Sequence, residues 1–85
     1  MSIEELIGQL MAVSERAETN IEHLERERGY VLETMEKVQK NFGDQSAGQQ
    51  MVAELYHALN NLSFADSSLN ALRSTLARYI NQLKQ

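Results

Sequence analysis

The segment Phe42-Gly43-Asp44-Gln45-Ser46-Ala47-Gly48 decides the fold, because it is the one cluster of helix-breaking and helix-capping residues in the chain. It lies at the midpoint of 85 residues that contain no proline. Gly43 fits the left-handed conformation that often ends a helix. The next helix can be capped by Asp44 or by Ser46, and Ser46 with Gln49 would make a capping box. The segment therefore predicts a turn between two helices.

The sequence on either side of this turn is typical of long helices. Ser2 and Glu5 form a second possible capping box at the start of the chain. We expect helices over about 2–42 and 46–84, joined by a turn over about 43–46, in one small domain. At 1.5 Å per residue each helix would be ~60 Å long. Gly29 interrupts the first helix only mildly, with a kink at that position as the alternative.

Apolar residues recur at alternating spacings of four and three in both halves, which is the heptad pattern of a coiled coil. The stripe in the first half comprises Ile3, Ile7, Leu10, Ser14, Ala17, Ile21, Leu24, Arg28, Val31, Met35, Val38 and Phe42. The stripe in the second half comprises Gly48, Val52, Leu55, Leu59, Leu62, Asp66, Leu69, Arg73, Leu76, Ile80 and Leu83. A short turn makes such helices antiparallel, so the predicted fold is an all-α two-helix hairpin.

The two stripes pair in one register from the turn outward, from Phe42 opposite Gly48 to Ile7 opposite Leu83. The small Gly48 leaves room for Phe42 at the bend. Arg28 and Asp66 fall in adjacent layers on opposite helices, and a lone buried charge is costly, so we expect an ion pair between them. The alternative is that the Arg28 stem lies along the helices with its head in water.

The second helix carries a further apolar stripe, which we call the partner stripe. Its members each precede a core position by one residue and are Met51, Ala58, Ala65, Leu72 and Tyr79. Two helices alone cannot cover both stripes. Residues 1–42 carry nine acids and five bases, whereas 44–85 carry three of each. We therefore expect the second helix to pack on a copy of itself, giving a homodimeric four-helix bundle, or on another helical protein.

Composition excludes several functional classes. The chain has no cysteine, which excludes disulfides and thiolate metal sites. Its net charge of −4 argues against a nucleic-acid partner. No apolar run is long enough to insert into a membrane. His23 and His57 fall in different layers, and no catalytic, cofactor or metal constellation is visible. We expect a non-enzymatic interaction protein without a cofactor. The acidic start, with Glu4 and Glu5, predicts a cytoplasmic protein or one secreted without a cleavable signal peptide.

The turn and the hairpin resemble the Trp-x-Gly proteins of type VII secretion, which carry a Trp-x-Gly turn followed by small residues. Here Phe42-Gly43-Asp44 stands at that position, and Ser46-Ala47-Gly48 follows it. The stretch 54–62 is similar to that family's second helix. Tryptophan is absent, and Tyr79 is followed four residues later by Leu83 where the family's export signal has an acid. The resemblance implies a secretion-associated substrate, adaptor or targeting partner, such as a small protein accompanying a larger secreted toxin. The alternative is a cytoplasmic structural or regulatory coiled coil, such as a secretion co-chaperone or a phage accessory protein.

Overall fold

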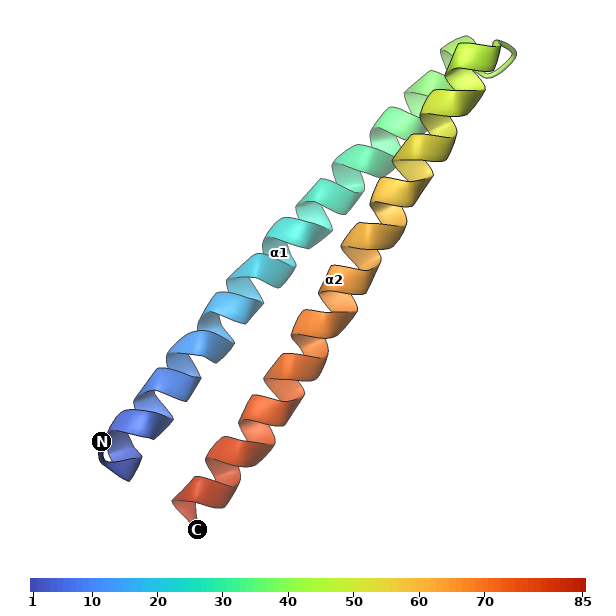
Figure 1. Ribbon diagram of the computed structural model, residues 1–85. Helices are drawn as coiled ribbons and strands as arrows, with labels where there is room; N and C mark the ends of the chain where they lie inside the picture. Colours follow the sequence, from blue (N-terminus) through green and yellow to red (C-terminus); the bar gives the residue numbers. More distant parts are fainter.

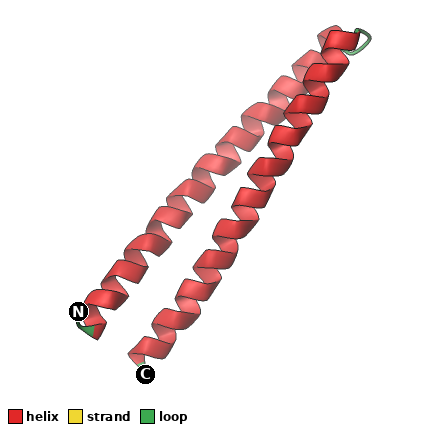
Figure 2. Ribbon diagram, viewed as in Figure 1, coloured by secondary structure: helices red, strands yellow, loops and turns green.

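The chain folds into two long antiparallel helices, which confirms the predicted all-α hairpin (Figure 1). The computed structural model describes all 85 residues. Helix α1 covers Ile3–Phe42 and helix α2 covers Ser46–Lys84. Apart from the chain ends, only the short connection between the helices is loop (Figure 2). Both termini therefore lie at the end of the hairpin opposite the turn.

The start of α1 is capped as the sequence indicates, although only one half of the capping box forms. The Ser2 hydroxyl accepts a hydrogen bond from the Glu5 backbone N–H at 3.1 Å. Ser2 has the extended backbone that a capping residue requires. The Glu5 carboxylate makes no return bond to Ser2. One of the four free N–H groups of the first turn is therefore satisfied by a side chain.

The turn differs from the predicted one, because Gly43 is right-handed, with φ −65° and ψ −20°. The Gly43 N–H donates to the Gln39 carbonyl at 3.0 Å, which continues the helical pattern. The Gln45 N–H then donates to the Phe42 carbonyl, also at 3.0 Å. The chain then reverses without any residue of positive φ. The expectation of a left-handed glycine at this position is therefore wrong.

Helix α2 begins without the predicted side-chain cap. Gln45 is the capping residue, and its side chain makes no capping bond. Ser46 is already the first helical residue. The Gln49 side-chain amide donates to the Gly43 carbonyl at 3.2 Å, so it closes the turn and does not complete a capping box. The free N–H groups in the first turn of α2 therefore have no side-chain capping bond like the one that Ser2 makes in α1.

The predicted heptad stripes form the seam between the helices. Every stripe residue of α2 is buried or half-buried. In α1 the same holds for all but Ile3, Arg28 and Phe42. The helix α1 runs through Gly29 without interruption. A 3.5-residue repeat keeps one face of each helix toward the other along the whole rod, which explains this agreement.

The hairpin is a thin rod that buries little of its own surface. Its extents are 61 × 16 × 14 Å, and its radius of gyration is 18.9 Å. A compact domain of the same length would have a radius of gyration of about 12 Å. Four of the 85 residues are buried, namely Ala17, Ile21, Gly48 and Leu76. Most side chains of the seam are therefore covered from one side only.

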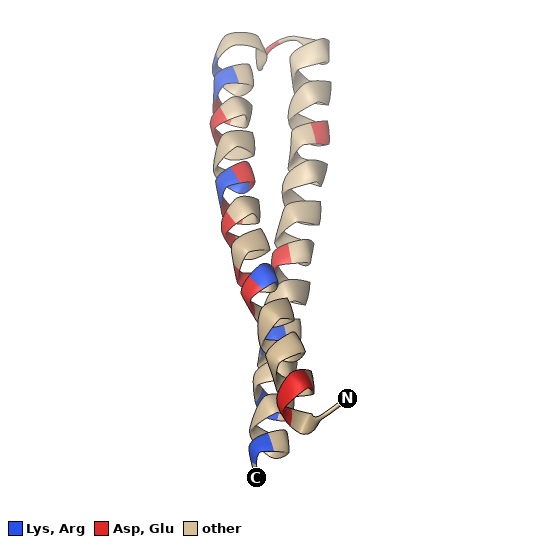
Figure 3. Cartoon of the chain, turned by 90° about the vertical axis from the view of Figure 1, so that its left-hand side faces the viewer, with Lys and Arg blue, Asp and Glu red and all other residues tan.

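Charged residues are distributed unequally between the two helices. Acidic and basic positions follow one another along α1, whereas α2 is mostly uncharged (Figure 3). One ion pair within α1 joins Glu33 and Lys37 at 3.7 Å, and both side chains are exposed. Neither helix contains a stretch both long and apolar enough to cross a lipid bilayer.

Candidate interaction surface

The partner stripe lies beside the seam, on the flank where shallow grooves run between the helices. One groove is lined by Asn20, His23, Leu24, Glu27, Ala65, Ser68 and Leu69. A second groove, nearer the turn, is lined by Thr34, Val38, Met51, Glu54 and Leu55. Both grooves therefore contain a member of the partner stripe and apolar residues of the seam. We call this side of the hairpin the groove flank.

The members of the partner stripe differ in exposure. Met51, Leu72 and Tyr79 are 43%, 39% and 51% exposed. Ala58 and Ala65 are half-buried. The stripe therefore exposes three large apolar side chains to solvent. The two alanines lie between Met51 and Leu72, so no large side chain of the stripe projects from the middle of α2.

The two walls of the central groove differ chemically. Helix α1 contributes Asn20, His23 and Glu27, which are exposed and polar. Helix α2 contributes Ala65 and Ser68, which are small and uncharged. The floor consists of Leu24 and Leu69. An apolar partner therefore meets less polar surface on the α2 side of this groove.

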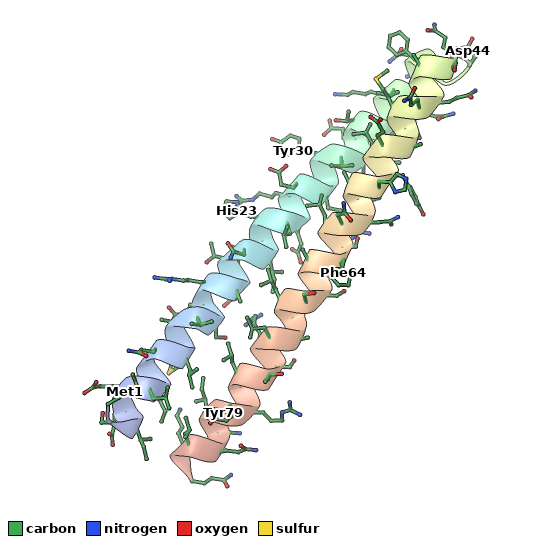
Figure 4. The ribbon with its side chains drawn as sticks, in the orientation of Figure 1. Met1, His23, Tyr30, Asp44, Phe64 and Tyr79 are labelled. Carbon is green, nitrogen blue, oxygen red and sulfur yellow. The ribbon has the colours of Figure 1, made fainter.

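The opposite flank also exposes apolar side chains, among them Tyr56, which the sequence analysis did not identify. Met11, Leu32 and Tyr56 are 46%, 46% and 55% exposed. Each follows a core position by one residue, so the three share a heptad position. That spacing is the signal by which Tyr56 could have been found. Phe64 and Tyr30 are more exposed still, at 75% and 66%, and project from the two helices outside both flanks (Figure 4).

The expected ion pair between Arg28 and Asp66 does not form. The ion pairs of the structure are Glu33–Lys37 and Glu18–Arg73, and Arg28 is exposed. The Asp66 carboxylate instead accepts a hydrogen bond from the Asn70 side-chain amide at 2.7 Å. A neighbour one helical turn away on the same helix satisfies Asp66 at less entropic cost than a long arginine from the other helix. Arg28 therefore agrees with the alternative expectation, in which its charged head lies in water.

Arg73 is the polar side chain that joins the two helices. Its Nη2 lies 3.6 Å from Glu18 Oε2, as the register opposite Ala17 predicts. Its Nε is buried and has no hydrogen-bond partner. The side chains of the pair are 38% and 55% exposed, so water screens the attraction. This contact indicates the register of the helices more than it stabilises them.

The remaining polar contacts are local. Side-chain hydrogen bonds join residues at most six positions apart, and none connects the two helices. The His23 Nδ1 lies 3.1 Å from Arg26 Nη2 on the same face of α1. No three histidine, aspartate or glutamate side chains gather closely enough to hold a metal ion. Apolar packing along the seam therefore holds the two helices together, and Glu18–Arg73 is the one ion pair between them.

Comparison with known proteins adds no family assignment. No protein-family pattern matches the chain, no curated protein is significantly similar to it, and no solved structure matches it significantly. The likeness to the Trp-x-Gly proteins therefore extends to the two-helix hairpin and has no support from a family match. The structure itself establishes an antiparallel helical hairpin with an apolar stripe beside its seam.

Proposed function

We propose that this protein is a non-enzymatic interaction protein that binds a helical partner through the partner stripe of α2. The observation that carries the proposal is the exposure of Met51, Leu72 and Tyr79 at heptad spacing on the groove flank. Exposed apolar residues at that spacing suit the side of a second helix, whose ridges pack between them. The low charge of α2 supports the same reading, since few charged groups need to lose water when a partner binds.

The matched substitutions Leu72→Glu and Leu32→Glu test this proposal. Both leucines are exposed to a similar extent, at 39% and 46%, but Leu32 lies on the opposite flank. We expect Leu72→Glu to remove association and Leu32→Glu to retain it, while both chains stay helical by circular dichroism. Association is read as solution mass, by light scattering of protein purified from cells that produce it. Equal association of the two variants would contradict the proposed binding surface. Met51→Glu provides a second variant on the same stripe.

We further propose that this binding serves a type VII secretion system, with the protein acting as a small substrate, adaptor or targeting partner. The hairpin fold and the aromatic-glycine turn at Phe42-Gly43 support this role. Culture supernatant from cells with an active and with an inactivated secretion system tests it. We expect the protein, together with its bound partner, only in the supernatant of the active system. Retention inside the cells in both cases would favour the cytoplasmic coiled-coil role.

A further inference from the structure

The surface area of the hairpin leaves room for one full protein interface. The chain exposes 6455 Å². A compact monomer of 9.7 kDa exposes about 5,100 Å², so the hairpin exposes roughly 1,300 Å² more than its mass requires. A standard interface takes about 800 Å² from each partner. One helical hairpin of the same length, laid along this one, would cover that excess.

The charge distribution indicates which helix would lie at the centre of such an interface. Residues 1–42 carry nine acids and five bases, so two copies of α1 would repel each other. Residues 44–85 carry three acids and three bases, so two copies of α2 approach without net repulsion. Most charged residues lie on α1 (Figure 3), so an arrangement with α2 inside and α1 outside would keep most charges in water.

The partner stripe is centred on the helix that carries it. Ala65 is the middle residue both of the stripe and of α2, which runs from Ser46 to Lys84. A two-fold axis beside Ala65 would overlap two antiparallel copies of α2 over their whole length. It would place Leu72 opposite the partner subunit's Ala58, and Met51 opposite the partner subunit's Tyr79. Large side chains then face small ones at Leu72, and the backbones approach closely at Ala65.

We infer that two copies of this chain pair antiparallel through α2, about a two-fold axis beside Ala65, to form a four-helix bundle. The inference rests on the proposed function, since it takes the partner stripe as the binding surface and names a second copy as its occupant. Self-association is isologous, so each copy both presents and fills the same stripe.

Single cysteines test this pairing cleanly, because the chain has none of its own. Ala65→Cys places one thiol on each side of the axis, and oxidation should link the two chains by a disulfide. Phe64→Cys is the matched control, since Phe64 is next to Ala65 in the sequence, is 75% exposed and lies outside the stripe. We expect cross-linking of Ala65→Cys to exceed that of Phe64→Cys on the order of tenfold, because pairing raises the effective thiol concentration. Mixing Ala58→Cys with Leu72→Cys chains should likewise give the mixed disulfide.

The solution mass and the cross-links together decide the outcome. Twice the chain mass, with preferential linking at Ala65 and between positions 58 and 72, supports the inference. Twice the chain mass with equal linking at Phe64, or without the 58–72 product, overturns the proposed pairing. The mass of a single chain, or of a complex with a different protein, overturns self-association. The proposed function fails separately, when Leu72→Glu associates as well as Leu32→Glu.

Discussion

Gly48 lies directly against the backbone of Phe42, where α2 leaves the turn and passes the last turn of α1. A Cβ at position 48 would stand 2.6 Å from the Phe42 carbonyl carbon and 2.8 Å from its Cβ. Such contacts are too short for carbon atoms, so any side chain here pushes the helices apart. The requirement at Gly48 is therefore space, since no glycine of the chain has a positive φ.

The first prediction follows from this contact. Gly48→Ala should destabilise the fold by about 1–3 kcal/mol, because overpacking forces the backbone of the turn to shift. Each kcal/mol corresponds to a fall in Tm of about 4–8 °C for a chain of this size. Thermal unfolding followed by circular dichroism at one fixed protein concentration measures the change. An unchanged Tm would show that the turn relaxes without cost.

Gly29 provides the opposite case within α1. No atom outside its own helix segment lies within 4 Å of a Cβ placed there. Gly29→Ala should therefore stabilise the protein by about 0.5–1 kcal/mol, since alanine has the higher helix propensity and less backbone entropy to lose. The same unfolding experiment should show a higher Tm. A lower Tm would mean that Gly29 permits a close approach or a bend that the helix requires.

The two helix starts differ in capping, and the difference is measurable. Ser2→Ala removes the bond to the Glu5 N–H and should cost about 1 kcal/mol. Gln45→Asp should stabilise by about 0.5–1 kcal/mol, because Gln45 has extended backbone and no capping bond, and the first turn of α2 has no acid. Chemical denaturation of both variants gives the two free energies. The assignment of Gln45 as an uncapped start would be contradicted by loss of stability in Gln45→Asp.

Arg28 and Asp66 should contribute to stability independently. A double-mutant cycle with Arg28→Met and Asp66→Asn should give a coupling energy below about 0.5 kcal/mol, as expected for residues without direct contact. The matched cycle with Glu18→Gln and Arg73→Met tests the pair that the structure does contain, at 3.6 Å, and should give about 0.2–1 kcal/mol. Denaturation at pH 7 supplies all the free energies. A larger coupling for Arg28 and Asp66 than for Glu18 and Arg73 would reverse the assignment of ion pairs.

The periodicity of the sequence was sufficient to predict the hairpin, its seam and the register of its helices. The alternation of four and three depends on local geometry alone, because a helix brings residues at those spacings to one face. Arg73 reaching Glu18 and Gly48 touching Phe42 both fit the predicted register. A midpoint cluster of breakers between two long heptad patterns permits few other folds.

Only the tertiary structure decided the details in which several local solutions have similar free energy. Gly43 can end a helix in either hand, and the hydrogen bonds to Gln39 and Phe42 selected the right-handed form. The Asp66 carboxylate could pair with Arg28 or accept a hydrogen bond from Asn70. It bonds Asn70, which is one turn away on the same helix, because ordering that short side chain loses less conformational entropy. The exposure of Met51, Leu72 and Tyr79 also depends on how closely α1 approaches α2, which no repeat specifies. Sequence spacing fixes which residues share a face, whereas the three-dimensional packing fixes what each of them contacts.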